Sequence, residues 1–119
     1  MHSVSAPHRF QAAVERPLSL VFQNPNGQWE GHDYRVTVVT ERIGLDEFDV
    51  VMDFRALEAA LNSVLDPMRG YSLGELGMNE PLDVAKKIAE TLIPSIAPPV
   101  RLAEVSLQDG TGRGITLRL

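Results

Sequence analysis

The chain has 119 residues and a net charge of −5, and it contains no cysteine. This length suggests one domain with a real hydrophobic core, so we expect residues 1–119 to form a single domain. The lack of cysteine excludes disulfides, thiolate metal ligands and a cysteine nucleophile. The negative charge, without any cluster of Lys or Arg, argues against nucleic acid as a partner. No stretch approaches the roughly 20 apolar residues of a membrane span, and the first six residues lack the apolar core of a secretory signal, so we expect a cytoplasmic protein with no membrane contact.

The N-terminal segment predicts a strand with one buried face. Within residues 3–15, apolar side chains recur at every second position, at Phe10, Ala12 and Val14. Pro17 is expected to end this run. Residues 18–22 then either continue the strand or form a packed loop.

Turn-forming residues separate this strand from the next. Residues 24–27 (NPNG) combine short polar side chains with a proline and a glycine, as turns require. The second strand is expected from about Tyr34 to Glu41. Residues 43–49 read as a polar turn with apolar anchors, and residues 50–52 (VVM) predict a further short strand.

From Phe54 the apolar period changes from 2 to about 3.6, which predicts an amphipathic helix. Asp53 is a natural N-cap, because its carboxylate can accept the free amides of the first turn. Asp66 precedes Pro67 and should end the helix, because a residue before proline avoids the α region. The predicted apolar stripe consists of Phe54, Leu57, Ala60, Leu61, Val64 and Leu65.

A glycine-containing loop over residues 69–78 leads to a second predicted helix, which begins near residues 79–81 with a proline in its first turn. Its solvent-exposed face is expected to carry Lys86, Lys87 and Glu90. The prolines from Pro94 onward are expected to end the helix. Its predicted apolar stripe consists of Leu82, Ala85, Ile88, Ala89 and Leu92.

The C-terminal segment returns to β character. Residues 100–107 and the alternating residues 115–119 predict two strands, and residues 109–112 (DGTG) form a hairpin connection rather than a phosphate loop. Two strands, two helices and two strands indicate an α+β fold, with a four-stranded antiparallel sheet and both helices on one face. Such a sheet leaves open edges, so we expect an oligomer that joins them.

Glu30 and His32 stand two residues apart before the second strand. In an extended segment, side chains at i and i+2 lie on one face, so both can point at the same spot. They are candidate metal ligands, although a catalytic zinc usually takes three protein ligands. The alternative is a polar strand entrance with Glu30 solvated and His32 hydrogen-bonded. His8, at the start of the first strand, is expected to be a solvated histidine that could also bind a ligand.

Several segments resemble motifs of the 6-pyruvoyl tetrahydropterin synthase and 6-carboxytetrahydropterin synthase family. Residues 31–36 (GHDYRV) resemble the family's H-G-H-N-Y-x-V motif, and residues 51–57 (VMDFRAL) resemble its V-x-D-F-x-x-L junction. Residues 65–68 (LDPM), followed by Leu73, are similar to its L-D-x-L-D-H-x-x-L segment. The resemblance implies a carbon-oxygen lyase scaffold with the tunnelling fold, whose members assemble as trimers around a β-barrel and often as hexamers.

Two shorter segments match in the same order. Residues 10–13 (FQAA) resemble the family's F-x-A-A/S-H opening, and residues 83–85 (DVA) resemble its E-N-L-A helix. The matches therefore span nearly the whole chain and support the expected β-β-α-α-β-β order.

By the resemblance, the family's zinc ligands are not all retained in this sequence. The family binds zinc through three histidines, whose positions fall here at Val14, Glu30 and His32. Valine cannot ligate a metal, and glutamate could do so only in place of an imidazole. We therefore expect no cofactor, with zinc on Glu30 and His32 as the alternative, completed by a further ligand such as His8.

The family's proton-transfer groups are also missing. The position of its cysteine falls at Asn26, which has no titratable proton for that role. The positions of its Asp-His pair fall at Arg69 and Gly70. By the resemblance, no catalytic residue is retained.

One ligand-binding position survives. The family recognises the amino-pyrimidine of the pterin with a carboxylate in a V-x-V-x-E-T arrangement, and residues 105–111 (VSLQDGT) offer Asp109 there. A carboxylate facing two adjacent N–H groups makes a bidentate, charge-assisted pair. The alternative is that Asp109 is only a turn residue before Gly110.

Three hypotheses about function follow. We favour a pterin synthase-like protein that lacks the standard lyase activity and binds a pterin-like or purine-like ligand, or assembles with an active paralogous subunit. The second hypothesis is an active enzyme with a remodelled metal site. The third is a structural or interaction module with a vestigial site. In each case we expect self-association as a trimer or hexamer.

Overall fold

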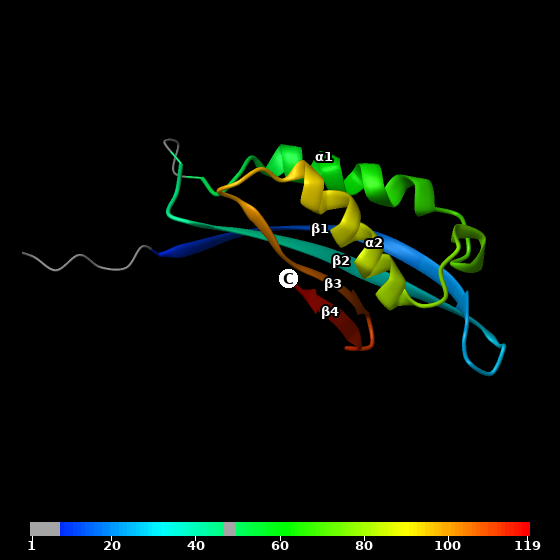
Figure 1. Cartoon of the computed structure of the whole chain (residues 1–119). Coiled ribbons are helices and arrows are strands. Elements are labelled where there is room, and N and C mark those ends of the chain that lie inside the picture. The colour runs from blue at the N-terminus through cyan, green and yellow to red at the C-terminus, as the bar shows by residue number, and fades with distance from the viewer. Residues whose placement is uncertain (1–7, 47–49) are drawn as a thin grey trace, which may run out of the picture.

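The computed structural model describes residues 8–46 and 50–119 (Figure 1). The elements in this part are β1 (Arg9–Gln23), β2 (Trp29–Ile43), α1 (Phe54–Leu65), α2 (Pro81–Leu92), β3 (Arg101–Asp109) and β4 (Gly114–Arg118). Three short 3₁₀ turns, Asp66–Met68, Gly74–Leu76 and Ile93–Ser95, lie between and after the helices.

The strands form one antiparallel sheet in the order β1-β2-β3-β4, and both helices lie on the same side of it (Figure 1). The predicted α+β fold is therefore confirmed. The core lies between these two layers. Val36, Val38, Val105 and Leu107 from the two central strands are fully buried there. Within residues 8–46 and 50–119, no helix lies on the other face of the sheet.

β1 is longer than the sequence predicts, because Pro17 does not end it. Pro17 pairs with Arg35 in the middle of a continuous ladder that runs from Arg9 to Gln23. Proline is tolerated here because β1 is an edge strand, where the missing N–H would face away from the sheet. Of the two alternatives for residues 18–22, continuation of the strand is the one observed. Residues 3–7 of the predicted strand lie outside the described residues.

β2 is also longer than predicted and begins at Trp29, so Glu30 and His32 lie inside the strand rather than before it. The short strand predicted at residues 50–52 is wrong, since Val51 and Met52 form a bend. Val51 is buried there without strand pairing. Residues 47–49 of the predicted polar turn lie outside the described residues.

Both helices end where the sequence predicts. The Asp53 carboxylate accepts a 2.9 Å hydrogen bond from the Arg55 amide and caps α1, and the helix stops at Leu65 before Asp66 and Pro67. Two details of the predicted stripes are wrong. Phe54 is half exposed at the first position of α1, and Val84 rather than Leu82 is fully buried on α2.

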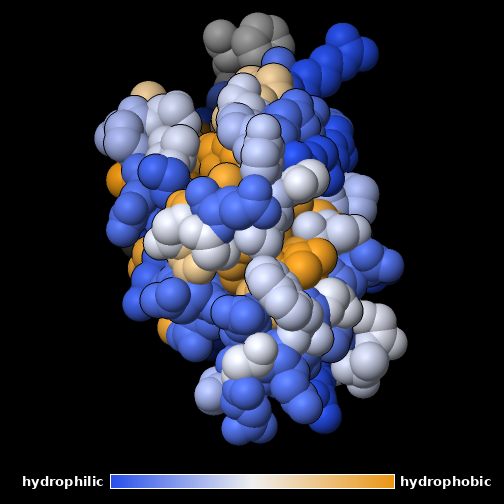
Figure 2. Space-filling model, turned by 90° about the vertical axis from the view of Figure 1, so that its right-hand side faces the viewer, coloured by the Kyte–Doolittle hydropathy of each residue, from blue (hydrophilic) through white to orange (hydrophobic). Residues whose placement is uncertain are grey.

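The helical layer is grooved at the end of the molecule that carries the β1–β2 turn. Figure 2 looks at this end and shows hydrophobic side chains between polar ones. A groove of about 570 Å³ lies between the end of α1 and the start of α2. Its apolar lining comes from Val64, Pro67, Met68, Leu76 and Met78.

Candidate functional site

Glu30 and His32 point to the same face of β2, as their spacing predicts. They share the side of the sheet that buries Tyr34 and Val36 beneath the helices. Nε2 of His32 lies 3.3 Å from Oε1 of Glu30. About a third of each side chain is accessible to solvent, 31% for His32 and 39% for Glu30. A hydrogen-bonded, part-buried pair is therefore present at the expected place.

Asp109 joins this pair from the neighbouring strand. It is the last residue of β3 and pairs with Tyr34, two residues beyond His32 on β2. Its Oδ2 lies 4.0 Å from Nδ1 of His32, and its side chain is only 6% exposed. Glu30 and the distant Asp109 thus both approach the imidazole ring of His32.

The other oxygen of Asp109 belongs to the β3–β4 turn. Oδ1 accepts hydrogen bonds from the Thr111 amide at 2.9 Å, the Thr111 hydroxyl at 2.7 Å and the Arg113 amide at 3.1 Å. The hydrogen bond from the Thr111 hydroxyl is the main cause that lowers the pKa of Asp109 below its usual value. Asp109 is therefore a turn residue, as the alternative interpretation holds, and it keeps one oxygen free to face His32.

Two aromatic side chains flank the imidazole. The rings of Phe22 and Tyr34 each have their centroid 6.0 Å from that of His32. Burial raises the pKa of the Tyr34 hydroxyl, and the nearby carboxylates of Asp109 and Glu30 raise it further. The alternation of side chains along a strand predicts that Tyr34 lies on the same face as His32. The sequence gives no reason to assign Tyr34 a functional role. Phe22 could have been found only with the strand register, which sets it opposite Glu30.

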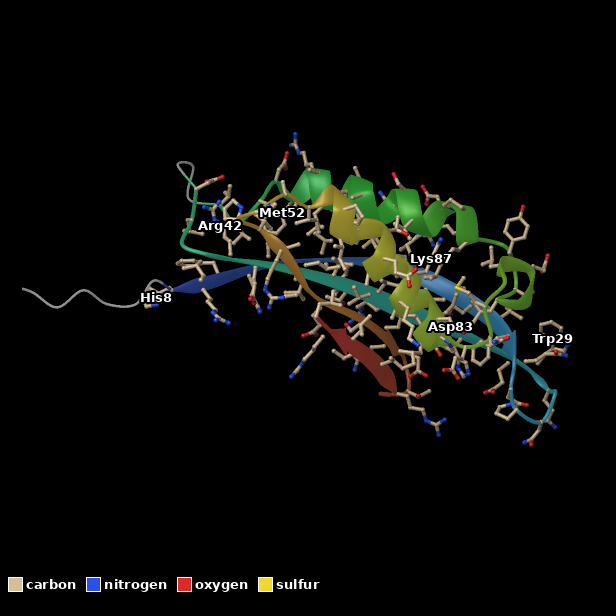
Figure 3. All side chains as sticks on the ribbon, in the orientation of Figure 1. His8, Trp29, Arg42, Met52, Asp83 and Lys87 are labelled. Atoms are coloured by element: carbon tan, nitrogen blue, oxygen red, sulfur yellow. The ribbon has the colours of Figure 1, made fainter. Side chains whose placement is uncertain are left out.

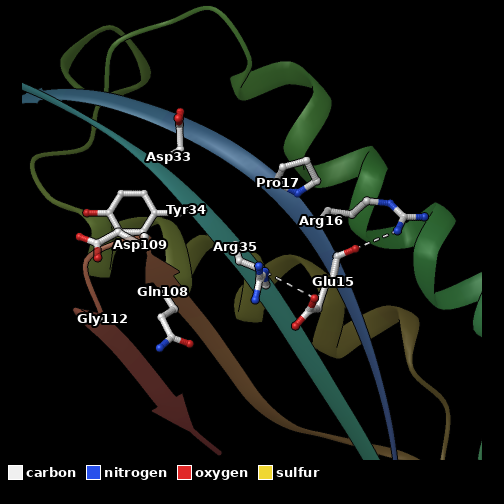
Figure 4. A pocket seen from close by; sticks show the side chains of 10 residues that line it. Glu15, Arg16, Pro17, Asp33, Tyr34, Arg35, Gln108, Asp109 and Gly112 are labelled. Carbon is white, nitrogen blue, oxygen red and sulfur yellow. Dashed lines mark hydrogen bonds and ion pairs between the residues drawn. The ribbon is translucent and has the colours of Figure 1, made fainter.

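A cavity of about 630 Å³ lies against Tyr34 and Asp109 (Figure 4). Figure 4 shows the carboxylate of Asp109 beside the Tyr34 ring, whereas the Gln108 side chain points in another direction. Across the cavity, Arg35 forms an ion pair with Glu15, at 3.6 Å between Nε and Oε2. This volume lies within the range typical of small-molecule sites, and the polar groups around it can both donate and accept hydrogen bonds.

The positions that would hold the other groups of the expected site are elsewhere. Val14 pairs with Val38, six residues along β2 from His32, which is about 20 Å at the rise of a strand. Asn26 lies in the β1–β2 turn, where its backbone N–H donates to the side-chain oxygen of Asn24. Arg69 donates to the Pro17 carbonyl at 2.8 Å and holds a loop against β1.

His8 lies at the opposite end of the sheet and cannot complete a site with His32 in the same chain (Figure 3). Its carbonyl accepts from the Gly44 amide, beyond the end of β2, whereas His32 pairs with Leu20. About 12 strand residues separate the two positions, or roughly 40 Å.

Zinc ligation does not fit the residues around His32. In residues 8–46 and 50–119, no group of three His, Cys, Asp or Glu side chains could hold a metal ion together. The reason is geometric. Glu30 faces Nε2 of the imidazole and Asp109 faces Nδ1, so the two carboxylates lie on opposite edges of the ring and cannot share one ion with it. A catalytic zinc usually needs three protein ligands.

Comparisons with known proteins agree with this architecture. The family model described as 6-pyruvoyl tetrahydropterin synthase matches residues 2–118. The chain belongs to the 6-pyruvoyl tetrahydropterin synthase family. The expected resemblance is thus confirmed over nearly the whole chain. No curated protein matches the sequence significantly.

Two solved structures show the same fold at low sequence identity. The 6-pyruvoyl tetrahydropterin synthase of Caenorhabditis elegans superposes with a TM-score of 0.74 at 15% identity, over 98% of this chain and 99% of that one. An uncharacterised protein from Wolinella succinogenes gives a TM-score of 0.68 at 15% identity, over 93% and 98% of the two chains. The chain therefore has the tunnelling fold of the 6-pyruvoyl tetrahydropterin synthase family. In the part that the structure describes, no helix is long and apolar enough to cross a membrane.

Proposed function

We propose that this member of the 6-pyruvoyl tetrahydropterin synthase family lacks the metal-dependent lyase reaction and binds a pterin-like or purine-like heterocycle beside Asp109. The observation that carries the proposal is the convergence of Glu30, His32 and Asp109 in an arrangement that does not fit zinc. The proton-transfer positions support it, because Asn26 and Arg69 take part in turn and loop contacts instead.

The ligand chemistry follows from the oxygens that remain. Pterins and purines such as guanine present adjacent N–H groups on one edge of a planar ring. Oδ2 of Asp109 can accept one of them, while Oδ1 stays in the turn. Gln108, the neighbour of Asp109 in β3, points to the opposite face of the sheet, so Oδ2 of Asp109 is the acceptor that this position offers. A charge-assisted hydrogen bond of this kind is roughly twice as strong as a neutral one.

The test is a fluorescence titration of the protein into neopterin, in the presence of a metal chelator. We expect saturable binding by the wild type and at least a tenfold weaker affinity for Asp109→Asn. Glu104→Gln is the matched control, because Glu104 also lies on β3 but pairs with Arg118, away from the cavity. Equal affinity in Asp109→Asn and the wild type would contradict the proposed ligand site.

Metal content decides the other half of the proposal. About one equivalent of zinc in the purified protein, together with turnover of dihydroneopterin triphosphate, would overturn the proposed loss of lyase activity. The competing hypothesis of a remodelled metal site predicts a thermal shift with divalent ions that Glu30→Ala and His32→Ala both remove.

Self-association is part of the same proposal. Among the described residues, β1 and β4 are the outer strands of the sheet and no further strand pairs with them, so pairing between copies would satisfy those outward backbone groups that are still free. A trimer or hexamer of the kind expected from the resemblance, or a mixed assembly with a paralogous subunit, would join these edges. The cytoplasmic location stays a prediction from the sequence.

A further inference from the structure

The two oxygens of the Asp109 carboxylate have different surroundings. Oδ1 accepts hydrogen bonds from the Thr111 amide at 2.9 Å, the Thr111 hydroxyl at 2.7 Å and the Arg113 amide at 3.1 Å. A carboxylate oxygen has about two lone-pair sites, so three donors saturate Oδ1. Oδ2 lies 4.0 Å from Nδ1 of His32, which is too far for a direct hydrogen bond. Asp109 can therefore offer a ligand only Oδ2.

The other charged and amide acceptors near this carboxylate point elsewhere. Three that line the same cavity alternate along their strands with the residues that face the helices, so they lie on the opposite face of the sheet: Glu15, Asp33 and Gln108. Glu30 shares the face of His32 but approaches the imidazole at Nε2, away from Oδ2 of Asp109. Within residues 8–46 and 50–119, Asp109 is therefore the carboxylate that lines this cavity from the helix side of the sheet, and its side chain is only 6% exposed.

A single free oxygen limits what this site can recognise. A carboxylate binds two adjacent N–H groups in a bidentate pair only when both of its oxygens are free. A heterocycle that donates one ring N–H to Oδ2 of Asp109 therefore leaves a neighbouring amino group without a charged acceptor. The Tyr34 hydroxyl keeps its proton, because burial and the nearby carboxylates raise its pKa, and a neutral acceptor gives roughly half the strength of a charged one. A ligand without the amino group would leave no carboxylate oxygen unpaired.

We propose that the Asp109 site recognises a single ring N–H of its ligand and does not select for an amino group beside it. This inference rests on the proposed function, because it concerns the same site. The ligand class is then planar heterocycles with a lactam N–H, whether the neighbouring carbon carries an amino group or an oxygen. Lumazines and xanthine belong to this class together with pterins and guanine. The β3–β4 turn sets this specificity, since it is the turn that occupies Oδ1.

The experiment compares pterin with lumazine, which carries an oxygen in place of the 2-amino group, by fluorescence titration with a metal chelator present. We expect the wild type to bind the two ligands with affinities within about threefold of each other, because a neutral contact to the amino group adds little. Asp109→Asn keeps one side-chain oxygen for the turn and should weaken both ligands by the same factor, about tenfold or more. Glu104→Gln is the matched control on β3 and should bind both ligands as the wild type does.

The outcomes separate this inference from the proposed function. A preference of the wild type for pterin by about tenfold or more, as a second charge-assisted hydrogen bond would give, overturns the inference and leaves the proposed site in place. This comparison uses the wild type alone, so it does not depend on the folding of a variant. A loss in Asp109→Asn that is about tenfold larger for pterin than for lumazine would also overturn the inference, because both oxygens would then contact the amino-bearing ligand. Equal affinity of Asp109→Asn and the wild type for both ligands would contradict the proposed function itself.

Discussion

His32 and Asp109 stand 77 positions apart in the sequence, yet Nδ1 of the one lies 4.0 Å from Oδ2 of the other. The register of β2 against β3 produces this approach, since it places Asp109 opposite Tyr34, which follows His32 on the same face. The turn then fixes the carboxylate through Oδ1, and only Oδ2 is left to act toward His32 or a ligand. The position of this candidate site therefore depends on the β3–β4 hairpin.

The first prediction concerns the acid sensitivity of that hairpin. The pKa of Asp109 is lowered in the folded protein, chiefly by the hydrogen bond from the Thr111 hydroxyl. A carboxyl whose pKa is lower in the folded than in the unfolded protein stabilises the fold fully at a pH above its unfolded pKa, about 3.9. This contribution is lost as the pH falls through the folded pKa. The difference in unfolding free energy between the wild type and Asp109→Asn should therefore stay constant from pH 7 to about 5 and shrink below pH 4. Urea denaturation at each pH measures it.

Thr111→Val is the variant that isolates the cause. It removes the hydroxyl donor but leaves both amide donors to Oδ1 in place. The folded pKa of Asp109 should then rise toward its usual value, which a carboxyl titration by NMR reads directly. A wild-type Asp109 that titrates near 3.9 in the folded protein would contradict the prediction.

The second prediction concerns the packing of α1 on the sheet. Leu61 is fully buried in the core, so Leu61→Ala should remove apolar contacts and leave a cavity. Substitutions of this kind cost about 2 to 5 kcal/mol of unfolding free energy. Ala59→Ser is the control, because Ala59 is exposed on the same helix and should change stability by less than about 0.5 kcal/mol. A loss below about 1 kcal/mol in Leu61→Ala would show that α1 does not pack as described.

The third prediction concerns a close approach inside the β3–β4 hairpin. A Cβ atom on Gly114 would lie 3.0 Å from the Leu107 carbonyl oxygen and 3.4 Å from Cα of Gln108. Gly114→Ala should therefore force the two strands apart and cost about 1 to 3 kcal/mol, as overpacking does. Gly110→Ala is the matched control in the same hairpin, since nothing lies within 4 Å of its Cβ position. Equal unfolding midpoints for the two variants in urea would refute the prediction.

The sequence predicts the layers of this fold well because periodicity and capping are local signals. Asp53 at the start of α1 and Asp66 before Pro67 at its end act through their immediate neighbours, and both positions are as predicted. Pro17 is different, because its effect depends on whether β1 lies at the edge or in the centre of the sheet. That distinction is a property of the strand order and cannot be read from the residues around Pro17.

The candidate site is predictable in part for the same reason. The spacing of Glu30 and His32 places them together on one face, and the structure agrees. Their approach to Asp109 follows from the register between strands, which the sequence of either strand alone does not fix. The register of β1 against β2 removes Val14 from the site, because it sets Val14 opposite Val38.

The outer edge of β1 is open along only part of its length. The Pro17 carbonyl accepts from Arg69, and the Val21 carbonyl accepts from the Leu73 amide, so the loop after α1 covers the second half of the edge. These contacts also show that odd-numbered residues of β1 point their backbone groups away from β2. In the first half, the outward backbone groups of Gln11 and Ala13 have no hydrogen-bond partner among the described residues.

The fourth prediction tests whether this open half joins copies of the chain. Ala13→Pro removes one outward N–H but no hydrogen bond to β2, so each chain should still fold while the assembly dissociates to smaller species. Ala13→Val keeps the N–H and should sediment as the wild type does. Sedimentation velocity measures the assembly, and circular dichroism checks the fold of each variant. If wild type and Ala13→Pro have the same sedimentation coefficient, copies do not pair along this edge, and an assembly through β1 is wrong.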